Sequence, residues 1–198
     1  MHRDKGQSLI EVIVACSVGI LVVAALTFAT IFSLRNANFA KNSAQATKLA
    51  QEGIERVRTG RDRNECINNI VPPNTVQSWN DGNTNCSGSG SIWNYQITKA
   101  GGCDNPGLPA PGDGGKCYFN VDSLGALTNI GFDYINLTTP IPSAAEGIPV
   151  ANPVFRRVVI LSDDAGSYQT QKTVTVIVTW TDFSGPHESK LTTILRKL

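Results

Sequence analysis

The chain has 198 residues, with 17 basic and 16 acidic side chains and a net charge of +1. This length suits one modest domain with attachments. The even charge balance argues against general affinity for nucleic acid or anionic lipid, because no large field exists to drive such binding. Hydrophobic residues make up 41% of the chain, but they are concentrated near the N-terminus, whereas the chain after residue 64 is rich in Asn, Gly, Thr and Pro. These two regions therefore call for separate interpretations.

The segment 12–34 contains no charged residue. As a helix it would be about 34 Å long, enough to cross a hydrocarbon core of about 30 Å. It is also longer than the apolar region of an ordinary secretory signal, which has roughly 7–15 residues. Basic residues flank it on both sides, with Arg3 and Lys5 before it and Arg35 and Lys41 after it. We predict a single-pass membrane helix with its N-terminus in the cytoplasm and an exported C-terminal part.

Glu11 lies directly before the apolar segment. A carboxylate costs roughly 2.5–3.5 kcal/mol at a bilayer centre and less near an interface, so such a residue usually has a partner. Removal of the first six residues would create a positive amine on Gln7, which shares a helix face with Glu11 because the two are four positions apart. The carboxylate could then pair with that amine in its own chain or in a neighbouring chain. The alternative is that Glu11 sits at the headgroup level of an uncut anchor.

Residues 6–12 read Gly-Gln-Ser-Leu-Ile-Glu-Val and lie between a basic leader and a helix of membrane length. This run resembles the prepilin cleavage and methylation motif of type IV pilins and type II secretion pseudopilins. The resemblance implies that a prepilin peptidase cuts after Gly6 and methylates the new terminus at Gln7. It also implies that Glu11 pairs with a neighbour's amine during assembly. The implied partners are the peptidase, other pilin or pseudopilin subunits, and the assembly platform in the membrane.

Helical character continues beyond the apolar segment. Apolar residues recur there at spacings of three and four, which gives one apolar stripe: Ala46, Leu49, Ala50, Gly53, Ile54 and Val57. Basic residues suit the last turn of a helix, where they oppose its dipole, and Gly60 suits the position just past the end. We therefore expect one helix over about residues 8–59, with its second half burying one face. An arginine cluster from Arg56 to Arg63 could be read as a DNA contact or as a solvated helix end. No aromatic residues interleave with it, so no clear nucleic-acid site is predicted.

Five cysteines are present. Cys16 lies in the apolar segment and is interpreted as a small packing residue. The other four, Cys66, Cys86, Cys103 and Cys117, lie in a Gly- and Pro-rich region, which indicates two disulfides and an oxidising compartment. Four cysteines allow three pairings, and the simplest is local: Cys66 with Cys86, and Cys103 with Cys117. Free thiols or a zinc site are the alternatives, although no pair has the short spacing of structural zinc sites.

The remainder of the chain reads as a β-rich head, so the predicted fold class is α+β. Residues 61–92 and the proline-rich stretch 140–153 read mainly as loops. Strands are predicted over residues 93–98, 116–122, 154–161, 172–181 and 188–196, with a short return strand from residue 126. We expect them to form an antiparallel sheet whose apolar face covers the helix stripe, with Val174, Val176, Val178 and Trp180 on that face. The last strands and their turn also resemble those of minor pilins and minor pseudopilins.

Residue types that carry catalysis are sparse. Of the two histidines, His2 would be lost on processing and His187 falls in a predicted turn. No Ser/His/Asp set, phosphate-binding loop or metal-ligating histidine pair is visible. Asp81, Asn83 and Asn85 have the oxygen spacing of a calcium loop but lack its Gly and its closing Glu. The sequence therefore predicts no enzyme, no cofactor and no metal.

The predicted organisation has four parts: a leader peptide at 1–6, a membrane-spanning assembly half of the helix at 7–34, an amphipathic half at 35–60, and a disulfide-stapled extracytoplasmic head at 61–198. The favoured function is a structural subunit, a minor pilin or pseudopilin, of a type IV pilus or type II secretion-like filament. It would reside first in the inner membrane and then in a filament at the cell surface or in the periplasm. One alternative is an uncleaved, single-pass anchored binding or adhesion module. An anchored enzyme would need a catalytic set that the sequence does not suggest.

Overall fold

The computed structural model describes residues 7–70, 75–80, 86, 90–94, 96–97, 116–133, 144–164 and 166–198. The chain divides into two compact units, a first unit of residues 1–42 and a second unit of residues 43–198. The predicted leader, residues 1–6, lies outside the described part, as do Cys103 and the Asp81–Asn85 candidate calcium loop.

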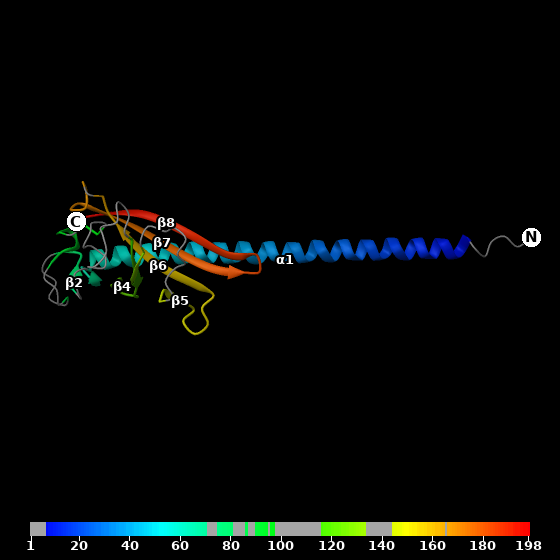
Figure 1. Ribbon diagram of the computed structural model, residues 1–198, viewed down its shortest axis with the longest axis horizontal. Coiled ribbons are helices and arrows are strands. Elements are labelled where there is room, and N and C mark those ends of the chain that lie inside the picture. Colours follow the sequence, from blue (N-terminus) through cyan, green and yellow to red (C-terminus); the bar gives the residue numbers. More distant parts are fainter. Residues whose placement is uncertain are drawn as a thin grey trace, which may run out of the picture. The chain divides into compact units, whose positions relative to one another are not determined.

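A single helix, α1 (Gln7–Asp62), contributes to both units (Figure 1). It contains no proline, and its bounds lie within three residues of the predicted 8–59. Gly60 was expected just past the end but lies inside the helix. Gly125 packs closely against this turn of the helix, because a Cβ on Gly60 would lie 2.1 Å from the carbonyl oxygen of Gly125. The glycine therefore permits this close contact and does not end the helix. The helix instead ends before Asn64, which adopts a left-handed conformation with φ of 58°.

Within the described residues, the second unit contains one eight-stranded sheet in the order β2-β1-β4-β3-β6-β7-β8, with β5 paired to β6. The strands are β1 (Cys66–Ile70), β2 (Thr75–Ser78), β3 (Lys116–Val121), β4 (Leu127–Asp133), β5 (Glu146–Ile148), β6 (Phe155–Ser162), β7 (Gln171–Asp182) and β8 (Gly185–Arg196). The predicted α+β class is confirmed, but the sheet is mixed rather than antiparallel throughout, because β1 and β4 are parallel. Parallel neighbours need a long connection, and the connection here includes β2 and β3.

Three local predictions are wrong. Strands β1 and β2 occupy a region expected to be loop, and β5 lies in the proline-rich stretch. The predicted strand at 93–98 begins instead with a short 3-10 helix, η1 (Ile92–Asn94). Here the backbone N–H of Trp93 donates to the Ser91 hydroxyl at 3.3 Å, and the Trp93 side chain is buried. The apparent alternation therefore reflects a turn that buries one large ring rather than a strand.

The hydrophobic core lies between α1 and the sheet. Strands β6, β7 and β8 run along the C-terminal half of α1 (Figure 1). The predicted helix stripe is buried, with Leu49 partly so, and the predicted apolar face of β7 is buried against it. Gly53 permits close packing, because a Cβ there would lie 2.9 Å from a methyl group of Val176. Burying these side chains stabilises the unit by roughly 25 cal/mol for each Å² of apolar surface removed from water.

Candidate functional site

The apolar half of α1 is exposed along its whole length. Phe28 and Phe32 are 73% and 67% exposed, and Val22 in the middle of the segment is 52% exposed. This helix is long and apolar enough to cross a membrane, and no residue in its most apolar window is buried. Contiguous exposed apolar surface of this size marks contact with lipid or with another protein.

Three hydroxyl side chains in the apolar half make hydrogen bonds within the helix. Ser17, Thr27 and Thr30 each donate a side-chain hydroxyl to a backbone carbonyl three or four residues earlier, at 2.7–2.9 Å. Such back-bonding lets hydroxyl side chains face an apolar environment. Cys16, in the same segment, is free and exposed in the single chain. These features allow the segment to be surrounded by hydrocarbon or by apolar helices.

The motif residues lie at the start of the described helix. Gln7 is the first residue of α1, and Glu11 follows one turn later with an exposed side chain. Gly6 lies outside the described residues. The helix therefore places Glu11 on the same face as the backbone of Gln7.

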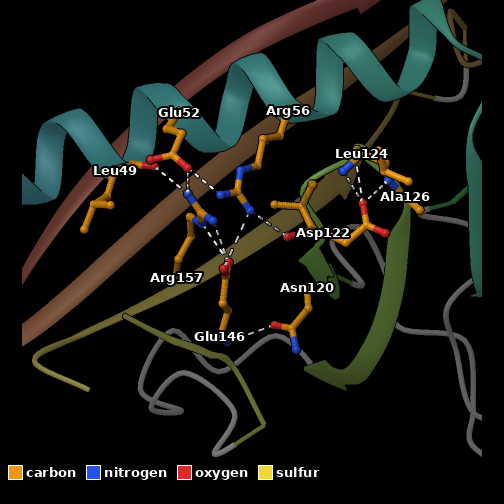
Figure 2. A network of polar contacts seen from close by, with 11 residues as sticks. Leu49, Glu52, Arg56, Asn120, Asp122, Leu124, Ala126, Glu146 and Arg157 are labelled. Carbon is orange, nitrogen blue, oxygen red and sulfur yellow. Dashed lines mark hydrogen bonds and ion pairs between the residues drawn. The ribbon is translucent and has the colours of Figure 1, made fainter. Parts of the chain in front are cut away.

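Arg157 fastens the sheet to the second half of α1 (Figure 2). Its side chain lies on β6 and is only 1% exposed. The Nε and Nη2 groups donate to Glu146 Oε2 on β5 at 2.9 and 2.7 Å, and Nη1 donates to the backbone carbonyl of Leu49 on α1 at 3.2 Å. Asn120 supports the start of β5, because its Oδ1 accepts the Glu146 backbone N–H at 2.9 Å. One buried guanidinium therefore joins two strands and the helix.

Two further charges complete this network. Arg56 Nη2 contacts Glu52 Oε1 at 2.5 Å, and Arg56 Nη1 lies 3.7 Å from Glu146 Oε1. Glu52 Oε1 is also 3.7 Å from Arg157 Nη1. Two arginines and two glutamates thus balance one another, so the buried Arg157 guanidinium does not carry an unpaired charge.

Arg58 and Arg61, near the helix end, are also engaged. Arg58 pairs with Glu55 at 2.6 Å and Arg61 pairs with Asp62 at 2.7 Å. Arg58 also donates to the Thr193 hydroxyl at 3.2 Å, and Arg61 donates to the Arg196 carbonyl at 3.1 Å. These side chains fasten α1 to β8.

A buried ion pair lies at the start of β7. Lys172 Nζ is 2.5 Å from Asp163 Oδ2, and both side chains are fully buried. The same carboxylate oxygen accepts the backbone N–H of Ile97 at 2.9 Å. Burial lowers the pKa of the Lys172 amine, while the adjacent Asp163 carboxylate opposes that change. Asp163, just after β6, therefore joins Lys172 on β7 to the segment that contains Ile97, which gives the pair a structural role.

The turn between β7 and β8 brings together an acid, a hydroxyl and an imidazole. Ser184 Oγ donates to Asp182 Oδ1 at 2.6 Å, and His187 Nε2 lies 2.9 Å from Ser184 Oγ and 3.0 Å from Asp182 Oδ1. In a catalytic triad the acid and the nucleophile face opposite ring nitrogens. Here one nitrogen meets both, so the arrangement braces the turn and does not activate the serine. Hydrogen bonds from Ser184, assisted by His187, lower the pKa of Asp182.

A disulfide joins Cys66 to Cys86, as the local pairing predicted. Cys117 is also disulfide-bonded, and its predicted partner Cys103 lies outside the described residues. Within the described ranges, no group of three or more His, Cys, Asp or Glu side chains is placed to hold a metal ion.

Several of these residues escaped the sequence analysis. The spacings of Glu52 to Arg56 and of Glu55 to Arg58 are visible signals of helix ion pairs. Arg157 with Glu146, and Lys172 with Asp163, carry no comparable signal, because each pair joins separate elements.

Comparison of the chain with protein-family models, with curated proteins and with solved structures gives no match in any of the three.

Proposed function

We propose that the chain is a structural subunit of a filament, a minor pilin or pseudopilin of a type IV pilus or type II secretion-like system. The precursor is held in the membrane by the first half of α1, a prepilin peptidase removes residues 1–6, and the helix then packs among the helices of other subunits. The observation that carries this proposal is a single helix that is apolar and exposed in its first half and built into a packed head in its second.

The exposed half of α1 suits both proposed locations of the protein, first the membrane and then the filament. A helix covered with apolar side chains is stable in lipid, and it is equally stable among other apolar helices because the two environments are similar. Moving from one to the other therefore requires little free energy. The internally satisfied hydroxyls of Ser17, Thr27 and Thr30 support the same conclusion.

Glu11 adds specificity to packing that would otherwise be non-directional. An ion pair between this carboxylate and the amine on Gln7 of a neighbouring subunit would set the axial position of one helix against the next. In surroundings of low dielectric constant, such a pair is much stronger than in water. An unpaired Glu11 would be correspondingly unfavourable, so misplaced subunits would be rejected.

The first test is the N-terminus of the mature protein. Sequencing of the protein recovered from membranes and from sheared filaments should begin at Gln7. A chain that still begins at Met1 in both fractions would contradict the proposal and favour the uncut, membrane-anchored binding module.

The second test compares Glu11→Ala with Glu55→Ala, which removes an exposed glutamate from the other half of the same helix. Glu11→Ala should reduce incorporation into sheared filaments by about tenfold or more, which corresponds to roughly 1.4 kcal/mol. The amount of protein in the membrane should stay unchanged, and Glu55→Ala should assemble normally. Equal incorporation of both variants would remove Glu11 from the assembly mechanism.

A further inference from the structure

An amine and a carboxylate face each other in the interior of the second unit. The pairing of β6 with β7 extends to Ser162 and Thr173. The next residues along the two strands are Asp163 and Lys172, which lie in contact. Lys172 is on the same face of β7 as Val174, the face that packs in the hydrophobic core. The strand register therefore holds the two groups together on the apolar side of the sheet.

This pair differs from the charged network around Arg157. In that network the Glu146 side chain is 25% exposed and the cation is a guanidinium. Here both side chains are 0% exposed, and the ring of Tyr168 lies over the amine, with 5.4 Å between Nζ and the ring centre. A guanidinium stays charged in proteins, whereas a buried lysine can lose its proton and act as a nucleophile. Of the two pairs, only that of Lys172 combines the exclusion of water with an amine that can react.

The geometry brings this amine close to the carboxyl carbon. Lys172 Nζ lies 2.5 Å from Asp163 Oδ2. Because a C–O bond is about 1.2 Å long, the nitrogen lies within roughly 4 Å of Cγ, near the ~3–3.5 Å of a near-attack arrangement. The backbone N–H of Ile97 donates to Oδ2 at 2.9 Å. A hydrogen-bond donor is therefore already aimed at the oxygen on which negative charge would develop during attack on Cγ.

We propose that Lys172 and Asp163 condense to form an amide bond within the folded chain. One ammonium proton first passes to the carboxylate, which gives a neutral amine and a carboxylic acid. Nζ then attacks Cγ, so that a C–N bond forms and the bond from Cγ to Oδ1 breaks. Oδ1 leaves as water with two protons that came from the ammonium, and Oδ2 remains as the amide oxygen. The reaction consumes no oxidant and no co-reactant.

Burial favours this reaction in two ways. It lowers the pKa of the Lys172 amine, although the adjacent Asp163 carboxylate opposes that change, and the neutral amine is the reactive form. Two buried charges also carry a desolvation penalty that their mutual attraction offsets only when the geometry is excellent. An amide carries no charge, so its formation removes that penalty, and its oxygen can still accept the N–H of Ile97.

The new bond would close a loop of residues 163–172 and join β6 to β7 covalently. Reducing agents, which open the Cys66–Cys86 disulfide, would leave it intact. All of the groups involved lie in the second unit. The proposal is therefore independent of leader removal, membrane insertion and filament assembly, and it can fail or hold without affecting the proposed function.

Peptide mapping of the full-length wild-type protein tests this proposal. The chain is purified in detergent, reduced, unfolded and digested with trypsin, which does not cleave after an acylated lysine. We expect most molecules to give a peptide of residues 158–190 that is lighter by one water molecule and uncut after Lys172. Fragmentation of this peptide should release no backbone fragments from within 163–172, because the closed loop holds them together.

Lys172→Arg is the matched control, because arginine keeps the positive charge but does not form the amide. Its tryptic peptide should end at position 172 and keep its full mass. Wild-type chains that are cleaved completely after Lys172, with an unmodified peptide 158–172, would overturn the proposal. Loss of water together with normal cleavage after Lys172 would also overturn it, because that result indicates a succinimide at Asp163 or Asp164. The wild-type digest decides the question even if the variant folds poorly.

Discussion

Along residues 9–34 of α1 the large apolar side chains are exposed, whereas along residues 46–57 of the same helix the apolar stripe is buried against the sheet. The backbone conformation is identical in the two stretches, because both belong to one uninterrupted helix. What differs is the surroundings that each sequence supplies for its side chains. The second stretch has β6, β7 and β8 within its own chain, whereas the first exposes an apolar surface that suits contact with lipid or with another protein.

The two stretches also treat charge differently. The first excludes charged residues from 12 to 34, so it can be surrounded by hydrocarbon without a desolvation penalty. The second admits Glu52 and Arg56 but pairs them with Arg157 and Glu146 from the sheet. Helix formation alone therefore does not determine whether a helix lies in lipid or in a protein core. The groups that contact its side chains determine this.

Removing the central charge of the head should have the largest effect. Arg157→Ala removes a buried guanidinium that bonds Glu146 and the Leu49 carbonyl, so we expect the free energy of unfolding to fall by about 3 kcal/mol. Urea unfolding of the full-length protein in a fixed detergent measures this. Arg156→Ala, at the exposed neighbouring position, should lower it by less than about 1 kcal/mol. Similar losses for both variants would mean that the buried network does not hold the sheet on the helix.

Placing a charge in the exposed half of the helix should leave the head intact but weaken its membrane anchor. Val22→Lys introduces an ammonium near the middle of the apolar segment, at a cost of roughly 2.5–3.5 kcal/mol for insertion. The fraction of protein that resists alkaline extraction from membranes should fall. The matched change Gln45→Lys, at an exposed position in the second unit, should not alter extraction. Full retention of Val22→Lys would show that this segment does not cross the bilayer.

The smallest effect concerns the β7–β8 turn and its dependence on pH. The pKa of Asp182 is lowered in the folded state, so its contribution to stability is present above its unfolded value of about 3.9. That contribution is lost as the pH falls through the lower, folded value. Asp182→Asn should therefore be less stable than wild type at neutral pH, and the difference should shrink in acid. A difference between the two unfolding curves that stays constant from pH 7 to pH 3 would contradict the assigned role.

The sequence was a good guide wherever one local pattern decided the outcome. The spacing of Ala46, Ala50 and Val57 predicted the buried stripe, and alternating Val174, Val176 and Val178 predicted the buried face of β7. The predicted local pair, Cys66 and Cys86, formed a disulfide. In the candidate site, Gln7 and Glu11 required only the helical repeat to lie on one face.

Patterns failed where distant residues decided the structure. The parallel pairing of β1 with β4 and the burial of Trp93 depend on packing across the sheet, which strand propensity does not report. The role of Gly60 also depends on a distant residue, because it permits close packing of the helix against the Gly125 backbone. The set of Asp182, Ser184 and His187 was not visible as residue types alone, and only its geometry distinguishes a braced turn from a triad.

By itself, the amino-acid sequence determined the long helix, its division into an apolar and an amphipathic half, and the β-rich character of the head. These properties arise from periodicity and composition, which act over a few neighbouring residues. Only the tertiary structure decided which charges meet in the interior. Arg157 lies more than one hundred positions from the helix carbonyl it binds. Contacts of that kind depend on how the chain folds back on itself, so no local pattern encodes them.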